Sequence, residues 1–169
     1  MNTLNLKYIL TQNEETNYNI GGVFNIDNFI TYYDTRKYYI VNTISDPSKM
    51  GHWVAFIFVK HNRKLLFIDS LGKPTSFYGG KIHSYFINYL GAKSELVKHQ
   101  LQHSSSLFCG AYVFFFLFHV RAGVSENRML TRFSKVNRKF NDRIVERFLI
   151  RKNGGLKECT SAFCPSEMF

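Results

Sequence analysis

The sequence contains few cysteines and few prolines, three of each among 169 residues. Cys109, Cys159 and Cys164 are too few for a disulfide-stabilised scaffold, and the C-x4-C spacing of the last two lacks the second pair of a structural zinc site. No metal site is therefore expected. Unpaired cysteines are typical of a reducing compartment.

A long apolar run is also missing. The longest nearly apolar stretch, residues 107–118, is shorter than the roughly 20 residues that a membrane-spanning helix needs. Residues 1–17 contain no charged segment followed by an apolar run, so no secretory signal is predicted. We expect a monomer that is neither secreted nor bound to a membrane.

Acidic residues are scarce relative to basic ones. The chain has 12 Asp and Glu against 22 Lys and Arg, which gives a formal net charge of +10. Residues 121–157 hold 11 of the basic side chains and three of the acidic ones, so most of the excess lies in this segment. A concentrated positive charge raises the local concentration of polyanions.

The same segment has helical periodicity, which predicts one helix over residues 125–151. Its apolar residues recur every three or four positions, at Met129, Phe133, Val136, Phe140, Ile144 and Phe148. A basic stripe accompanies them, formed by Arg128, Arg132, Lys135 and Lys139. The stripe is either the solvated face of a docked helix or a surface for nucleic acid or an acidic partner. No zinc-finger, homeodomain or ribonucleoprotein motif accompanies it.

Apolar runs separated by polar turns predict the rest of the fold. Runs at 53–59 and 65–69, joined by the polar turn 60–64, predict a buried β-hairpin. Further strands are predicted over 38–43 and 96–101, and helices over 82–90 and 109–120. The fold class is α+β, with a mixed central β-sheet flanked by helices.

The length of the chain suits a single domain over residues 1–169. We divide it into a polar, loosely held N-terminal segment, a core, and a basic C-terminal helix and tail. Their bounds are 1–19, 20–123 and 124–169.

Cys109 is the first candidate for chemistry, because it lies at the predicted N-terminus of the apolar helix. The positive end of the helix dipole and the unpaired N–H groups there stabilise a thiolate, which is the nucleophilic form of cysteine. Gly110 leaves the approach to the thiol open. The alternative is a small buried cysteine at a helix start.

A nucleophilic cysteine needs a base, and the base needs an orienting group. His52 precedes the first hairpin strand and Asp69 ends the second. In an antiparallel hairpin these two residues are opposite each other if the turn is centred at 60.5, and a centre one residue later shifts the pairing by two positions. The alternatives are a polar strand-edge residue for His52 and a turn-forming residue for Asp69.

Gln102 completes the set of candidate residues. It lies seven residues before Cys109, on the loop that enters the apolar helix. Its side-chain amide and the backbone N–H of Cys109 are expected to converge on a carbonyl oxygen as an oxyanion hole. A loop glutamine is otherwise ordinarily solvated.

Together these pieces resemble the adenain family, the adenovirus-type cysteine proteases, which are related to the ubiquitin-like-protein-specific proteases. The matching segments are 40–43, 51–56, 66–72 and the Gln102-x6-Cys109-Gly110 motif, in the family's order of His, acid, Gln and Cys. The resemblance implies the protease fold and a thiol endopeptidase of a virus, virophage or Polinton-type element.

By residue, the resemblance implies His52 as base, Asp69 as its orienting group, Gln102 as oxyanion donor and Cys109 as nucleophile. It makes residues 20–123 the catalytic core. It implies that Trp53 walls a narrow substrate cleft that admits glycine, although a packed core tryptophan is the alternative. Asp69 itself matches the ubiquitin-like-protein proteases, since the adenovirus enzyme has Glu there.

The implied substrates are viral capsid and core precursor proteins, cleaved at glycine-containing sites during virion maturation. The implied location is therefore the virion and the interior of the host cell. No cofactor is required, although DNA and an activating peptide serve the family as activators. In the adenovirus enzyme the peptide attaches to a cysteine upstream of the nucleophile, and no cysteine precedes Cys109 here.

Three functional hypotheses follow. The first is the maturation endopeptidase. The second is a protease that removes ubiquitin or a ubiquitin-like modifier, for which the same glycine-selective cleft would serve. The third is a non-catalytic, basic DNA-binding protein on a protease scaffold.

Overall fold

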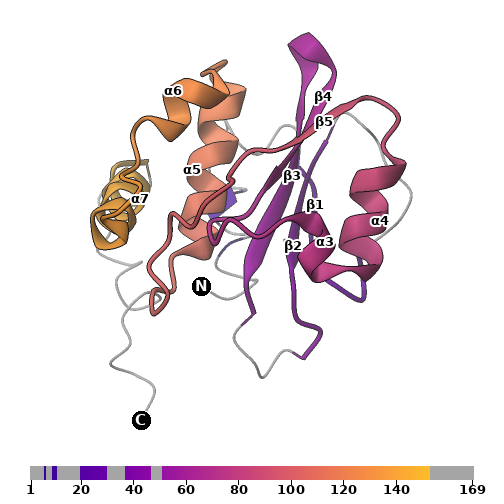
Figure 1. Ribbon diagram of the computed structural model, residues 1–169, viewed down its shortest axis with the longest axis horizontal. Helices are drawn as coiled ribbons and strands as arrows, with labels where there is room; N and C mark the ends of the chain where they lie inside the picture. The colour runs from indigo at the N-terminus through magenta and orange to yellow at the C-terminus, as the bar shows by residue number, and fades with distance from the viewer. Residues whose placement is uncertain (1–5, 7–8, 11–19, 30–36, 47–50, 153–169) are drawn as a thin grey trace.

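A mixed five-stranded β-sheet forms the centre of the molecule (Figure 1). The computed structural model describes residues 6, 9–10, 20–29, 37–46 and 51–152. In sheet order the strands are β1 (Ile20–Asn25), β2 (Tyr38–Asn42), β3 (Trp53–Val59), β4 (Lys64–Ile68) and β5 (Ala92–Glu95). The two outer pairs are parallel and the two inner pairs antiparallel. The expected α+β class with a mixed sheet is confirmed.

The β3–β4 hairpin occupies the middle of this sheet, as predicted. All seven residues of β3 are buried, because the strand is covered on both faces and its continuous apolar sequence suits that position. A short 3-10 turn, η1 (Lys60–Asn62), and a left-handed residue, Arg63, reverse the chain. The register pairs Ala55 with Ile68, which centres the turn one residue later than 60.5. If this register is continued by one residue, Asp69 comes opposite Val54.

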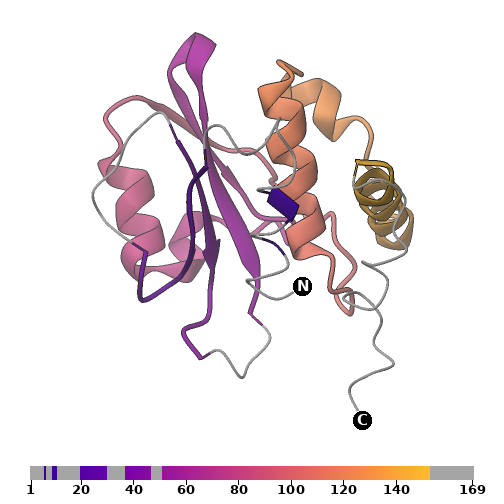
Figure 2. The same cartoon turned by 180° about the vertical axis from the view of Figure 1, so that it is seen from behind.

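Helices cover the two faces of the sheet in separate layers (Figures 1 and 2). On one side lie α3 (Thr75–Tyr78) and α4 (Gly80–Asn88), and on the other lies α5 (Cys109–Arg121). Alternate residues of β3 divide between two apolar clusters. Ala55 packs toward α5, whereas Phe56 stacks on Phe29 and contacts Tyr85 of α4.

The α5 helix is buried on nearly all sides, as its uniformly apolar sequence predicts. Its outer side is covered by α7 (Arg138–Lys152), with the short α6 (Glu126–Leu130) between the two in the chain. The ring of Phe148 on α7 lies 5.1 Å from that of Phe115 on α5. On this side of the sheet α5 therefore forms the inner helical layer and α7 the outer one.

The N-terminal segment was expected to be polar and loosely held, and the three of its residues that the structure describes are apolar and buried. Leu6, Ile9 and Leu10 are at most 3% exposed and belong to the apolar cluster beneath α5. Burying three aliphatic side chains contributes roughly 1.5–3 kcal/mol each. These three residues therefore contribute to the core. The other residues of 1–19 lie outside the described part of the chain.

The single helix expected over residues 125–151 is also wrong. The chain leaves the helical path after α6 and restarts at α7, because Ser134 and Asn137 cap a new helix. The Ser134 hydroxyl accepts from the N–H of Asn137 at 2.9 Å, and the Asn137 side chain accepts from the N–H of Phe140 at 3.0 Å.

The break also removes two residues of the predicted apolar stripe from the docked face. Val136 is 88% exposed and Phe140 is 50% exposed, although both were expected on the docked face. The face of α7 turned to the core contains the buried Asn141, Asp142, Val145 and Leu149. Ile144 and Phe148 of the predicted stripe are partly buried and also pack against the core. The strand expected over 96–101 is likewise displaced, since β5 precedes it.

We expect Asn137→Ala to destabilise the protein by about 0.5–2 kcal/mol, because it removes the cap that satisfies the first turn of α7. Urea denaturation measures the free energy of unfolding. The matched control is Asn127→Ala, an exposed position on α6, which should change stability by less than about 0.5 kcal/mol. Equal values for the two variants would show that Asn137 is not a functional cap.

Candidate active site

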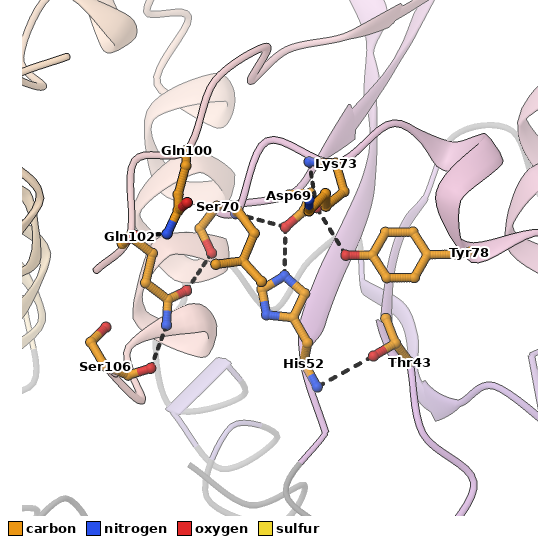
Figure 3. A network of polar contacts seen from close by, with 10 residues as sticks. Thr43, His52, Asp69, Ser70, Lys73, Tyr78, Gln100, Gln102 and Ser106 are labelled. Atoms are coloured by element: carbon orange, nitrogen blue, oxygen red, sulfur yellow. Dashed lines mark hydrogen bonds and ion pairs between the residues drawn. The ribbon is translucent and has the colours of Figure 1, made fainter. Parts of the chain in front are cut away.

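The four predicted residues meet at the open end of the β3–β4 hairpin. His52 immediately precedes β3, Asp69 immediately follows β4, and Cys109 is the first residue of α5. Gln102 lies on the loop between β5 and α5. Figure 3 shows His52 between Asp69 and Tyr78 on one side and Gln102 on the other. In this register His52 lies two residues from the position opposite Asp69. The two side chains still meet, because residues two apart on a strand point to the same face.

Asp69 is 1% exposed, and its carboxylate accepts four hydrogen bonds. The Oδ1 atom accepts from His52 Nε2 at 2.5 Å and from the backbone N–H of Leu71 at 2.8 Å. The Oδ2 atom accepts from the backbone N–H of Lys73 and from the Tyr78 hydroxyl, both at 2.9 Å. The carboxylate is therefore fixed in position and fully paired.

This pairing sets the tautomer of His52. An ionised carboxylate only accepts, so His52 Nε2 carries the proton that is shared with Asp69. The Nδ1 atom is then the ring nitrogen that faces Cys109, the second side chain to which His52 is hydrogen-bonded. The order of contacts is thus Cys109, His52, Asp69.

The two reacting groups have pKa values shifted toward an ion pair. Burial lowers the pKa of His52, but its hydrogen bonds to Asp69 and Cys109 and their charges outweigh burial and raise that pKa to about 9. Burial raises the pKa of the Cys109 thiol, whereas the hydrogen bond and charge of His52 and a backbone hydrogen bond from Trp53 lower it below the ordinary thiol value. Both shifts therefore stabilise the imidazolium–thiolate pair relative to the neutral pair.

The start of α5 adds to the same effect. The helix begins at Cys109 without a side-chain cap, so the N–H groups of its first turn remain available near the thiol. The helix dipole stabilises negative charge at this end. The backbone of Cys109 is therefore suited to bind an oxyanion.

Gln102 is 3% exposed, so it is not a solvated loop residue. Its Oε1 accepts from the Ser70 hydroxyl at 2.6 Å, and its Nε2 donates to the carbonyl of Ser106 at 2.7 Å (Figure 3). Ser106 is three residues before Cys109 in the chain. The amide is therefore held at the approach to α5.

Ser70 and Tyr78 were not predicted from the sequence. Ser70 follows the acid directly, yet its side chain turns to Gln102, a partner 32 residues away. Tyr78 reaches Asp69 because the chain turns back after β4, with Gly72 at φ 69°. Burial and the Asp69 charge raise the pKa of Tyr78 above its usual value, so its hydroxyl stays protonated and donates.

Trp53 is placed differently from the expected cleft wall. It is 1% exposed and belongs to the apolar cluster beneath α5. The structure therefore corrects the substrate-binding prediction in favour of the alternative, a packed core tryptophan. Trp53 contributes to the site through its backbone, which is hydrogen-bonded to Cys109.

The basic residues predicted to bind nucleic acid do not form one helical stripe. Arg128 lies on α6, Arg132 and Lys135 on the connection, and Lys139 on α7, and all four are exposed. Arg132 contacts the buried ring of His119, with 3.2 Å between the guanidinium and Nε2.

The described residues contain no group of three or more His, Cys, Asp or Glu placed to hold a metal ion. Within the same part of the chain, no helix combines the length and apolar character that crossing a membrane requires. Cys109 is the free cysteine of the described residues. Cys159 and Cys164 lie outside them.

No protein-family model matches the sequence, and no curated protein matches it. Among solved structures, the chain is similar to the Chlamydia trachomatis effector protein ChlaDUB1, with a TM-score of 0.47 and 12% sequence identity. The match covers 69% of this chain and 57% of that one, so the chain matches little more than half the length of the effector. A match at this level does not inform on activity, and the functional conclusion depends on the geometry of the site.

The ion pair predicts the pH dependence of thiol alkylation. In a Cys159→Ser, Cys164→Ser chain, we expect iodoacetamide to modify Cys109 at pH values well below the ordinary thiol pKa of about 8.5. Reactivity should fall only when acid protonates the thiolate, because His52, with a pKa of about 9, stays charged throughout neutral pH. Mass spectrometry at each pH measures the rate.

His52→Ala should move the midpoint of this profile upward, since burial then acts on the thiol without the compensating charge. The control is His83→Ala, whose ring contacts Thr75 near the start of α3 and which should leave the profile unchanged. If Cys109 titrates like a free thiol in the unsubstituted chain, the ion pair does not form.

Proposed function

We propose that this chain is a cysteine endopeptidase with Cys109 as nucleophile, His52 as general base and acid, and Asp69 as the group that orients His52. The observation that supports it is the continuous line of contacts from Cys109 through His52 to the buried carboxylate of Asp69. A nucleophile, a base and an orienting group in this order are the parts that thiol catalysis requires.

In the proposed reaction the Cys109 thiolate attacks the carbonyl carbon of the scissile peptide bond. The oxyanion that forms is bound by the Cys109 N–H and by a side-chain N–H of Gln102. Protonated His52 then donates its proton to the departing amine, which leaves a thioester on Cys109. His52 next removes a proton from water, the water oxygen attacks the thioester, and the thiolate is released.

For the substrates we propose viral structural precursor proteins, cleaved at glycine-containing sites during virion maturation. Support comes from the sequence, in which the segments around His52, Asp69 and the Gln102-x6-Cys109 motif resemble the adenovirus-type proteases. Removal of ubiquitin or a ubiquitin-like modifier remains the alternative, because the same chemistry at a glycine residue would serve both.

The test uses the purified full chain with two sets of fluorogenic substrates, Gly-x-Gly peptides and C-terminal conjugates of ubiquitin and ubiquitin-like modifiers. We expect hydrolysis by the unsubstituted chain and none by Cys109→Ala. Gln102→Ala should lower kcat by about 10²–10³-fold, the usual cost of losing one oxyanion donor. The preferred substrate set separates the endopeptidase from the deconjugating protease.

Each assay is run with and without double-stranded DNA. Equal hydrolysis by Cys109→Ala and the unsubstituted chain would overturn the assignment of Cys109 as the nucleophile. No hydrolysis of any substrate under either condition would favour the non-catalytic alternative.

A second function, binding of DNA, is favoured by the surface of α6, α7 and their connection. All nine Lys and Arg side chains of residues 126–152 are exposed, whereas the three acidic ones are partly or fully buried. Glu126 pairs with Lys64 at 2.7 Å, and Asp142 accepts from Tyr112 at 2.9 Å. The outward charge of this segment is therefore almost wholly positive, which suits a polyanion.

Fluorescence anisotropy with labelled double-stranded DNA tests this surface. Binding by the Cys109→Ala chain should weaken as salt rises. Replacing Arg128, Arg132, Lys135 and Lys139 by Gln should reduce the slope of log K against log salt by about 0.9 for each phosphate that the protein no longer neutralises.

The matched control carries four Gln replacements at exposed lysines elsewhere, Lys60, Lys81, Lys93 and Lys98. If the control loses as much affinity and slope as the test variant, binding follows net charge and the surface is not a site.

A further inference from the structure

We propose that Ser70 is a positioning residue for the oxyanion hole, holding the Gln102 amide so that an N–H faces the substrate carbonyl. The inference rests on the proposed peptidase function and adds a residue to it. It begins from the contact between the Ser70 hydroxyl and Gln102 Oε1, 2.6 Å long and buried (Figure 3).

The orientation of the Gln102 amide follows from its partners. The backbone carbonyl of Ser106, 2.7 Å away, only accepts hydrogen bonds, so the atom facing it must be Nε2. The opposite end of the amide is then Oε1, and the Ser70 hydroxyl must donate to it. An amide turned the other way would place two acceptors against each other at Ser106.

One of the two side-chain N–H groups of Gln102 remains without an acceptor among the described residues. Its Nε2 carries two hydrogens, and the Ser106 carbonyl takes one of them. Among the described residues no acceptor is found for the second. An oxyanion donor needs a free N–H with a fixed direction, because the direction must already be set when negative charge develops.

Ser70 also holds the main chain of Gln102. Its carbonyl oxygen accepts from the N–H of Leu101 at 2.9 Å and from that of Gln102 at 3.0 Å. The backbone and the amide of Gln102 are therefore both fixed to the same residue. Ser104, in the same loop, is exposed.

The position of Ser70 explains why one residue can serve this purpose. It directly follows Asp69, in the turn after β4 that the hydrogen bond from the Gly72 N–H to the Asp69 carbonyl closes at 3.0 Å. Asp69 turns to His52 while Ser70 turns to Gln102 (Figure 3). The end of β4 thus sets the base and the oxyanion donor relative to one another.

Losing the Ser70 hydroxyl leaves Oε1 buried without a donor, so the amide rotates to find another partner. We expect Ser70→Ala to lower kcat by about 10–100-fold, since a small misplacement of a catalytic group has effects of this size. KM and the pH profile of Cys109 alkylation should stay unchanged, because neither depends on the amide. Ser70→Thr, which keeps the hydroxyl, should restore most of the activity.

The test compares Ser70→Ala in the unsubstituted chain and in a Gln102→Ala background, with Ser104→Ala as the matched control. If Ser70 acts through Gln102, its substitution has no further effect once the amide is gone. Full activity in Ser70→Ala, or an equal loss in both backgrounds, would overturn the proposal. Circular dichroism and urea denaturation identify any variant that fails to fold, in which case Ser70→Thr and Ser70→Cys take its place.

A second readout does not require turnover. In the 15N-labelled chain, the side-chain amide signals of Gln102, identified by their loss in Gln102→Ala, should exchange slowly with solvent and more rapidly in Ser70→Ala. Equal exchange in both would overturn the positioning role. If the amide is immobilised by Ser70 but the unsubstituted chain cleaves no substrate, the peptidase proposal fails and the positioning of Gln102 stands.

Discussion

A 2.5 Å hydrogen bond joins the buried carboxylate of Asp69 to the ring of His52, and the rest of the candidate site is arranged around it. Because Asp69 also accepts from two backbone N–H groups and from Tyr78, it cannot turn away from the imidazole. The bond fixes which ring nitrogen is protonated and leaves the other for Cys109. The raised pKa of His52 and the lowered pKa of Cys109 both depend on this arrangement.

The layers of the fold bring these groups together. The hairpin supplies His52 and Asp69 from one end of the sheet, and α5 supplies Cys109 from the layer above. Since β3 is buried along its whole length and α5 nearly so, neither element can move independently. The thiol and the imidazole are therefore held by packing as well as by their own hydrogen bond.

The α7 helix supports the loop that carries Gln102, the proposed oxyanion donor. Asn141 of α7 donates to the carbonyl of Leu101 at 3.0 Å, and Tyr112 of α5 donates to Asp142 at 2.9 Å. The buried face of α7 is polar at its first turn for this reason, and its exposed face retains the basic side chains. One helix thus combines a structural contact with the loop at 101–106 and a strongly positive outer surface.

The sequence by itself determined the hairpin, the apolar helix and the position of Cys109 at its start, because strand and helix periodicity are local properties of the chain. It also placed His52 and Asp69 within reach of one another, since a hairpin register is set by its turn. Only the tertiary structure decided that Trp53 is buried and that the Gln102 amide is fixed by Ser70. Both depend on partners distant in the chain. The helix break depends on capping by Ser134 and Asn137, a local signal that the longer apolar periodicity concealed.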